Sequence, residues 1–326
     1  MNYRTLGKSG FKVSEIGLGC WQLGNDFGPV EDAEAVAILD SASEQGVTFF
    51  DTADVYGGGL SESRIGSWLQ KQSLPPLVAT KVGRNAQLYP NGYSKSAIRE
   101  SLQASANRLG VECIDLAQLH CVPSEVLFDG EILTWMEDLQ QEGLIAQFGA
   151  SVEMIDEALF ALKHPKLTSL QVLFNLFRQD AIERLFPAAA EADVGIIVRL
   201  PLASGLLSGH MTLDRKFAEG DHRNYNRDGN AFHVGETFNG LPYEKGVELA
   251  DAVKGLLPEG QDLLDVALRW ILDQPQVSTI IAGVSRHQQI LRNARASQLA
   301  PLDPQTHERL ANFYFENVRQ HIRGGI

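Results

Sequence analysis

The chain has 326 residues, of which 44% are hydrophobic and 21% charged, a balance typical of a protein with a large buried core. Its formal net charge of −13 argues against a nucleic-acid or anionic-membrane surface, because both require a basic patch. Three cysteines, Cys20, Cys113 and Cys121, are odd in number and lack a Cys-x-x-Cys spacing, which argues against disulfides or a zinc site. With neither a signal-peptide core nor a long apolar run, a cytoplasmic protein is expected.

The first elements predicted are a hairpin, a strand and a helix. Residues 3–14 alternate around the turn Gly7–Gly10 and predict a small β-hairpin. A first short strand is expected over Val13–Cys20. Residues 31–45 have a helical composition, and Gly46 is a suitable residue to end that helix.

Short apolar runs then alternate with helical segments to the end of the chain. The clearest helix is 95–109, where Ile98, Leu102 and Ala106 share one face and Gly110 follows. The strands expected after the first lie within 48–57, 77–81, 114–120, 145–150, 169–174, 194–200 and 278–283.

Eight strands separated by helices predict an α/β fold of the (β/α)8 TIM-barrel type, because the strands are apolar on both faces. We expect one domain over 1–326, with a long loop at 204–241 after strand seven and a closing helix at about 304–323. A doubly wound sheet is the structural rival. Its usual Gly-x-Gly-x-x-Gly turn is absent, since residues 17–22 read Gly-Leu-Gly-Cys-Trp-Gln and lack the third glycine.

Four proton-handling residues fall at or just past the carboxyl ends of predicted strands: Asp51, Tyr56, Lys81 and His120. Barrel enzymes carry their chemistry at these ends. A lysine close to a tyrosine favours the phenolate and lowers the phenol pKa, and an aspartate can hold that lysine in place. A histidine can hydrogen-bond a carbonyl oxygen. Each residue alone could equally be structural, but together they predict a site that protonates an oxygen gaining negative charge.

These segments resemble the aldo-keto reductase family, in order along essentially the whole chain. The resemblance rests on Phe50–Gly57 (Phe-Asp-Thr-Ala-Asp-Val-Tyr-Gly), Lys81, Leu119-His120, Gly149-Ala150-Ser151, Gln171, Pro201–Gly209 and Gly283-Val284-Ser285-Arg286. It implies that Tyr56 is the general acid, that Lys81 and Asp51 tune it, and that His120 orients the substrate carbonyl.

The resemblance also implies a nicotinamide cofactor, with NADP(H) preferred and NAD(H) as the alternative. A helix N-terminus beside Arg286 is physically suited to a 2′-phosphate. Ser151 and Gln171 are expected near the nicotinamide carboxamide. The implied cofactor residues are Ser151, Gln171, Arg199, Leu202, Ser204, Gly205, Leu206, Gly283, Ser285, Arg286, Gln289 and Asn293.

Two residues depart from the family pattern. Val152 follows Ser151 where many members have asparagine, which removes one potential hydrogen bond to the carboxamide. Arg199 stands where members often place an aromatic ring under the nicotinamide. Its guanidinium could stack on that ring or reach a substrate carboxylate or a phosphate.

The substrate is expected to be a small carbonyl compound or alcohol, and no metal is expected. Cys121 is interpreted as a loop or pocket thiol, and His210, His222 and His233 match no metal spacing. Trp21, Phe27, Tyr89 and Val122 either line the substrate pocket or pack at the barrel rim.

The sequence thus predicts an NADP-dependent reductase of aldehydes or ketones, which could also run in reverse on an alcohol. Three alternatives remain open. The first is a cofactor-binding regulatory subunit with little turnover, and the second an NAD-linked sugar or alcohol dehydrogenase. The third is a barrel isomerase or lyase that uses the lysine–tyrosine pair without nicotinamide. Natural substrate and oligomeric state are not predicted, since substrate specificity lies in variable loops.

Overall fold

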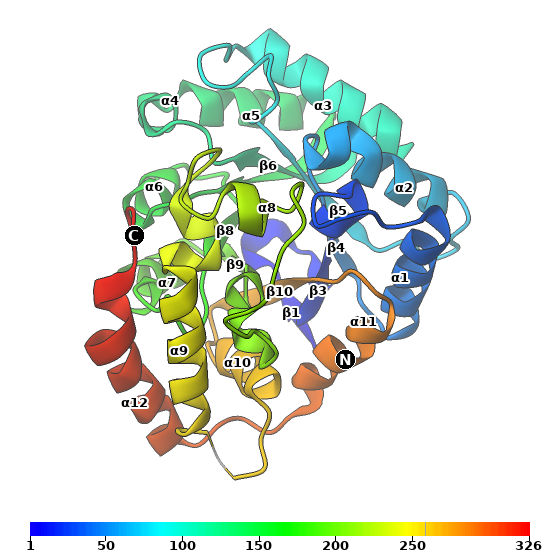
Figure 1. Cartoon of the computed structure of the whole chain (residues 1–326). Helices are drawn as coiled ribbons and strands as arrows, with labels where there is room; N and C mark the ends of the chain where they lie inside the picture. Colours follow the sequence, from blue (N-terminus) through cyan, green and yellow to red (C-terminus); the bar gives the residue numbers. More distant parts are fainter. Residues whose placement is uncertain (258) are drawn as a thin grey trace.

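A computed structural model describes residues 1–257 and 259–326. Eight parallel strands close into a barrel in the order β10–β3–β4–β5–β6–β7–β8–β9 (Figure 1), which confirms the predicted (β/α)8 architecture. The strands are β3 (Ile16–Gly19), β4 (Phe49–Asp51), β5 (Leu77–Val82), β6 (Ile114–His120), β7 (Ile145–Ser151), β8 (Ser169–Leu173), β9 (Gly195–Arg199) and β10 (Val277–Gly283).

Helices surround the barrel and bury its outer face (Figure 1). In α3, Ser94 caps the first turn, buried Ile98 and Leu102 face inward, and Gly110 ends the helix in the left-handed region, as predicted. The helices are α1 (Asp32–Glu44), α2 (Leu60–Leu69), α3 (Lys95–Leu109), α4 (Ser124–Asp129), α5 (Glu131–Gln141), α6 (Ile155–Ala161), α7 (Ala181–Glu191), α8 (His222–Tyr225), α9 (Tyr243–Lys254), α10 (Leu263–Leu272), α11 (Gln288–Arg295) and α12 (Pro304–Phe313).

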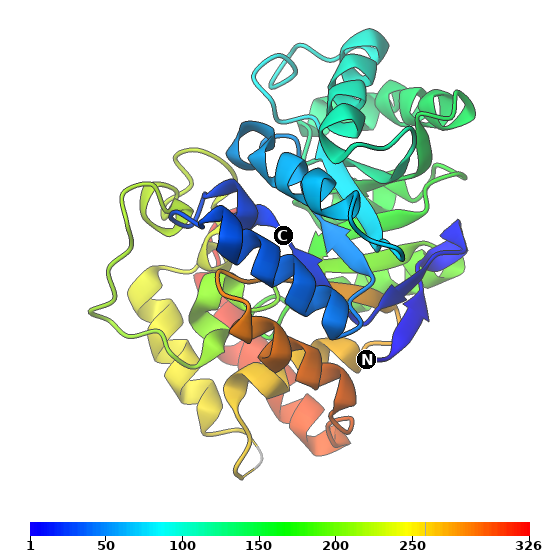
Figure 2. The same cartoon turned by 90° about the vertical axis from the view of Figure 1, so that its right-hand side faces the viewer.

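The predicted hairpin closes the amino-terminal end of the barrel. β1 (Tyr3–Thr5) pairs antiparallel with β2 (Lys12–Ser14), and Leu6 between them is fully buried. Figure 2 shows this hairpin on the opposite side of the molecule from the long segment 204–241. The expected first strand Val13–Cys20 is corrected here: Val13 belongs to the hairpin, and the barrel strand is only Ile16–Gly19.

The long segment after β9 covers the carboxyl end of the barrel, where α8 lies in front of the strands in Figure 1. It holds α8 and short 3-10 turns, so it is less irregular than its composition suggested. Arg323, near the end of the chain, fastens this segment by donating to the Gly240 carbonyl at 2.8 Å and to Asp228 at 2.6 Å. Within the described residues, no helix is both long and apolar enough to cross a membrane.

The closing helix is shorter than predicted. α12 ends at Phe313, and the chain continues as a π turn, Tyr314–Val318, and a 3-10 turn, Arg319–His321. Tyr314 is fully buried and donates a hydrogen bond to Asp180. This contact secures the segment against the start of α7.

Candidate active site

Neighbouring strands bring the predicted aspartate, lysine and histidine together at the carboxyl end of the barrel. Asp51 ends β4, Lys81 lies one residue before the end of β5, and His120 ends β6. Lys81 Nζ donates to Asp51 Oδ2 at 2.5 Å, to the Thr52 carbonyl at 3.0 Å and to Tyr56 Oη at 3.2 Å. Asp51 and Lys81 are each only 1% exposed. The four residues predicted to act together, hereafter the tetrad, therefore lie close to one another, with Tyr56 half-buried and the other three buried.

The turn after β4 places Tyr56 over the lysine. Gly57 and Gly58 adopt left-handed conformations, with φ of 59° and 62°, and a Cβ at Gly57 would collide with the Gly24 carbonyl. The Trp21 ring stacks on Tyr56 with centroids 5.6 Å apart, and the His120 ring meets it edge-on at 6.0 Å. The phenol is thus held between aromatic neighbours with its hydroxyl toward Lys81.

Two glutamines hold the second oxygen of Asp51. Gln171 Nε2 donates to Asp51 Oδ1 at 2.7 Å, and Gln118 Nε2 donates to the same oxygen at 3.2 Å. Gln118 was not predicted, although it lies two residues before His120 and alternate residues of a strand share a face. Gln171 was expected at the carboxamide, and here its amide nitrogen also orients the aspartate.

The protonation states follow from burial and charge. Burial raises the pKa of Tyr56 to about 12, because desolvating the phenolate outweighs the opposing charge of Lys81. The net shift is opposite to the one expected from the lysine alone. Burial also disfavours the Lys81 ammonium, but Asp51 and Tyr56 outweigh it and raise the pKa of Lys81. Burial and nearby cations hold the pKa of His120 well below its ordinary value. At neutral pH the site holds a protonated phenol, an ammonium and a neutral imidazole.

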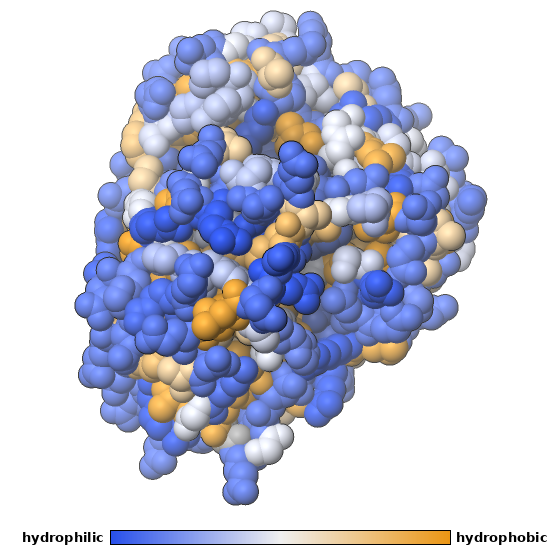
Figure 3. Space-filling model, viewed as in Figure 1, coloured by the Kyte–Doolittle hydropathy of each residue, from blue (hydrophilic) through white to orange (hydrophobic). Residues whose placement is uncertain are grey.

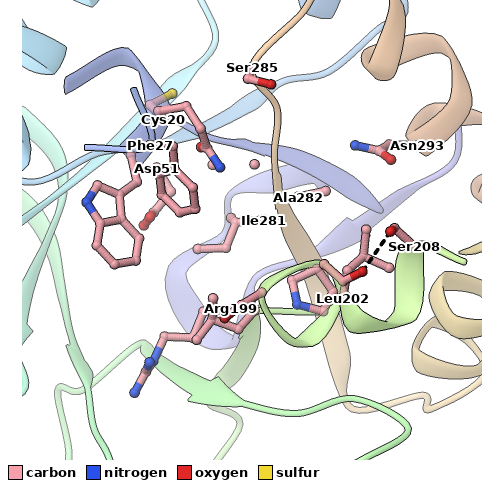
Figure 4. A pocket seen from close by; sticks show the side chains of 18 of the residues that line it. Cys20, Phe27, Asp51, Arg199, Leu202, Ser208, Ile281, Ala282, Ser285 and Asn293 are labelled. Carbon is pink, nitrogen blue, oxygen red and sulfur yellow. Dashed lines mark hydrogen bonds between the residues drawn. The ribbon is translucent and has the colours of Figure 1, made fainter. Parts of the chain in front are cut away.

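A pocket of about 410 Å³ opens above the tetrad. Figure 3 shows a hollow near the centre of a largely hydrophilic face, with hydrophobic residues at its edge. In Figure 4, Phe27 and Asp51 lie at one side of the pocket and Ser208 and Asn293 at the other. The predicted residues that line it are Trp21, Phe27, Asp51, Tyr56, His120, Ser151, Gln171, Arg199, Leu202, Ser204, Gly205, Gly283, Ser285, Gln289 and Asn293.

Near His120 lies a group of charges, hereafter the Arg–Glu cluster: Arg199 and Glu236, which are buried, and Arg84 and Glu153, which are half-buried. Arg84 pairs with Glu153 at 2.5 Å and with Glu236 at 3.3 Å, and Arg199 lies 3.4 Å from Glu236. Arg199 also donates to the Val152 carbonyl at 3.0 Å. In Figure 4 its side chain extends away from Leu202. The sequence reasoning missed Arg84, Glu153 and Glu236, which lie on loops.

Residues 15–314 match the model of the Aldo/keto reductase family. The chain belongs to the aldo-keto reductase family. It is 32% identical over 303 residues to the uncharacterized oxidoreductase YqkF of Bacillus subtilis, covering 91% of each chain. The holo form of the aldo-keto reductase AKR11C1 from Bacillus halodurans superposes with a TM-score of 0.76 at 29% identity over 96% of both chains. The glycerol dehydrogenase AKR11B4 from Gluconobacter oxydans superposes with a TM-score of 0.75 at 25% identity, over 97% of this chain and 94% of that one.

Membership of this oxidoreductase family confirms the resemblance read from the sequence. Five predicted residues nevertheless do not line the pocket of this aldo-keto reductase: Lys81, which contacts Tyr56 below it, and Tyr89, Val122, Leu206 and Arg286. Tyr89 is 50% exposed, whereas Val122 and Leu206 are buried in the hydrophobic core. Arg286 is exposed, and its backbone N–H donates to Gln289 Oε1 at 3.1 Å. Tyr89, Val122, Leu206 and Arg286 lie in connections between strands and α-helices, where the strand period does not fix the direction of a side chain.

Three arginines also line the pocket. They are Arg215, Arg223 and Arg292, and His210 lines it with them. Arg292 pairs with Asp262 at 2.7 Å and contacts His210 Nε2 at 3.1 Å, whereas Arg223 is held by Asp221 at 2.6 Å. Arg292 lies on α11, six residues beyond the arginine that the sequence reasoning chose. Arg292 is therefore the arginine of α11 that lines the pocket.

Proposed function

We propose that this aldo-keto reductase uses NADP(H) to interconvert an aldehyde or ketone and an alcohol. The observation that carries the proposal is the position of Lys81 Nζ, which bridges Asp51 and the Tyr56 hydroxyl directly beneath the pocket. When bound, the reduced nicotinamide supplies the hydride that none of these side chains can provide.

The residues present suit such a cofactor. The pocket extends from the tetrad to α11. The side-chain amides of Gln171, on β8, and Asn293, on α11, both line it. Between them, Leu200, Ala203 and Ser204 all have positive φ, so the turn after β9 presents backbone to the pocket. Backbone N–H groups in such turns are suited to phosphate oxygens.

Tyr56 supplies the proton to the carbonyl oxygen during reduction. Its raised pKa keeps the phenol protonated at neutral pH, and the Lys81 ammonium stabilises the phenolate left behind. Neutral His120 lines the same pocket and can donate one hydrogen bond to that oxygen without adding charge. Asp51, held by Gln171 and Gln118, keeps the ammonium in position.

The preference for NADP(H) over NAD(H) is supported by Arg292, which lines the pocket together with Ser285 and Asn293. A 2′-phosphate carries negative charge that an arginine can bind with charge-assisted hydrogen bonds. Arg292 is the candidate that the structure favours, because it lines the pocket and Arg286 does not.

The test is a fluorescence titration of NADPH and NADH with wild type, Arg292→Ala, Arg286→Ala and Arg295→Ala. Arg295 is a matched control, since it lies on the same helix, pairs with Asp265 and does not line the pocket. We expect Arg292→Ala to weaken NADPH binding roughly 10-fold, the value of one charge-assisted contact, and to leave NADH binding unchanged. Arg295→Ala should change neither affinity.

Other outcomes would favour the alternatives. Equal affinity for both cofactors in wild type would indicate an NAD-linked or dual-specificity dehydrogenase. Tight NADPH binding without turnover of any carbonyl would favour a regulatory cofactor-binding subunit. Absence of binding to either nucleotide would contradict hydride transfer and favour an isomerase or lyase.

A further inference from the structure

The turn that carries Tyr56 is tied to the loop after β5 by a buried aspartate, Asp54. This residue precedes Tyr56 by two positions and is 7% exposed. Its Oδ2 accepts a hydrogen bond from Asn85 Nδ2 at 2.8 Å and another from Ser101 Oγ at 3.1 Å. Asn85 belongs to the loop between β5 and α3, and Ser101 lies on α3. One carboxylate therefore joins the turn after β4 to the next strand–helix unit.

The partners of Asp54 are themselves held in place. Asn85 Oδ1 accepts from the backbone N–H groups of Gln87 at 3.1 Å and Leu88 at 3.2 Å, which fixes the asparagine side chain within its own loop. Asn85 Nδ2 also donates to Ser101 Oγ at 3.0 Å. The donors thus point in directions set by the β5 loop and α3, so it is the turn of Asp54 that they position.

The same turn lies against Lys81. The Asp54 backbone N–H donates to the Lys81 carbonyl at 3.3 Å, and the Tyr56 N–H donates to the Ala53 carbonyl at 3.2 Å. Lys81 Nζ reaches Tyr56 Oη at 3.2 Å, at the upper end of the usual hydrogen-bond range of ~2.7–3.2 Å. A small outward shift of the turn would therefore break the contact through which the ammonium stabilises the phenolate.

Stability alone does not account for a carboxylate at position 54. Burial raises the pKa of Asp54, and the hydrogen bonds from Asn85 and Ser101 offset this shift only in part. Its Oδ1 is buried without a hydrogen-bond partner among the described residues. A buried carboxylate with an unfilled oxygen destabilises a fold, and such departures from good packing are expected where function requires them.

We propose that Asp54 is a positioning residue that holds the turn of Tyr56 at contact distance from Lys81. It acts through Asn85, and it does not line the pocket, so a bound substrate would meet Tyr56 and not Asp54. This role rests on the proposed proton transfer by Tyr56. Arg84 of the Arg–Glu cluster directly precedes Asn85, so the same hydrogen bond also connects the tetrad with that cluster.

The test measures propanal reduction with NADPH in wild type, Asp54→Ala and a matched control, Asp115→Ala. Burial also raises the pKa of Asp115, and its Oδ2 accepts from the Val78 N–H at 2.9 Å near the amino-terminal ends of β5 and β6, away from the site. Asp54→Ala should lower kcat roughly 10- to 100-fold, the loss expected from a small displacement of a reacting group. Its NADPH affinity, and both quantities in Asp115→Ala, should stay within about twofold of wild type.

A conservative variant separates positioning from a general loss of structure. Asp54→Asn keeps an oxygen that can accept from Asn85, so it should recover most of the kcat that Asp54→Ala loses. Asn85→Ala removes the same hydrogen bond from the other side and should reproduce the loss of kcat. This second variant keeps the proposal testable if Asp54→Ala does not fold.

Hydrogen–deuterium exchange of the unliganded protein gives a measurement that does not depend on turnover. The backbone N–H groups of Tyr56 and Gly58 are bonded within the turn, to the carbonyls of Ala53 and Val55. They should exchange several-fold faster in Asp54→Ala than in wild type, and at the wild-type rate in Asp115→Ala.

Two results would overturn the proposal. One is unchanged kcat and exchange in folded Asp54→Ala. The other is an equal loss of kcat in Asp54→Ala and Asp115→Ala together with a lowered unfolding temperature, which would show a structural role only. If wild type reduced no carbonyl despite binding NADPH, the proposed function would fail instead, and the exchange rates would still decide whether Asp54 holds the turn.

Discussion

The tetrad and the Arg–Glu cluster both contribute side chains to one pocket, yet they are built differently. Lys81 meets its three partners at 2.5–3.2 Å, and the lysine and aspartate both come from barrel strands. In the cluster, Glu236 meets its arginines at 3.3–3.4 Å and comes from a long loop-rich segment. The strand ends fix the groups to which we assign proton transfer, whereas the long segment positions a carboxylate that its arginines approach less closely.

The largest effect that would sharpen this contrast is expected at Tyr56. Tyr56→Phe removes the proton donor but keeps the ring that stacks on Trp21, so kcat for carbonyl reduction should fall ~10²–10⁴-fold. NADPH affinity should stay within about twofold, because the phenol acts on the carbonyl oxygen. Steady-state kinetics with a fluorescence titration measure both quantities. Full activity of Tyr56→Phe would show that Tyr56 is not the proton donor.

A smaller effect, on stability, is expected where the long segment packs on the aromatic residues of the pocket. His222 on α8 is fully buried, and its ring nitrogens make no hydrogen bond among the described residues, although Nδ1 lies 3.6 Å from Asp221. Burial lowers the pKa of His222 to about 4, with Asp221 opposing and Arg223 reinforcing the shift. The folded state therefore binds this proton more weakly than the unfolded chain. The stability that neutral His222 contributes is complete above the unfolded pKa and is lost as the pH falls toward the folded one.

His222→Phe should remove this acid sensitivity. Relative to wild type, the variant should gain about 3 kcal/mol in the free energy of unfolding at about pH 4, and change little at about pH 7. Urea unfolding at the two pH values gives the difference. A gain that is the same at both values would mean that packing, and not titration of the imidazole, is responsible.

The smallest effect concerns the pH dependence of reduction. The pKa of Tyr56 is raised and that of His120 is lowered, so neither group changes protonation near neutrality. With propanal, kcat should stay within about twofold between roughly pH 6 and pH 9. Alcohol oxidation needs the phenolate and should instead rise steadily with pH over that range. An inflection near neutrality in the propanal profile would indicate that another group controls the step.

The accuracy of the sequence predictions also differs between strands and loops. The β-branched runs and their ends predicted eight strands and the positions of Asp51, Lys81 and His120, because strand period and barrel topology leave few alternatives. Only the boundary at Val13 was misplaced, since the hairpin and the first barrel strand are nearly continuous in sequence.

The loop residues could not be predicted in this way. Glu236 lies more than 100 residues from Arg84 in sequence, and no local pattern relates the two. Arg286 was chosen because it begins the last barrel helix, but the helix turns Arg292 toward the pocket instead. Gln118 could have been found, since it shares a strand face with His120.

The central claim is that Tyr56, held by Lys81 and Asp51, protonates a carbonyl oxygen as a hydride reaches the adjacent carbon. The most direct measurement uses NADPH carrying deuterium at C4 with an aldehyde, followed by mass spectrometry of the alcohol. We predict that wild type, with the label on the transferred face, places one deuterium on the former carbonyl carbon, and that Tyr56→Phe binds the cofactor but forms almost none of this product. Tight binding of the labelled cofactor by wild type, with no deuterium in the product of any aldehyde, ketone or hydroxyaldehyde supplied, would contradict the account.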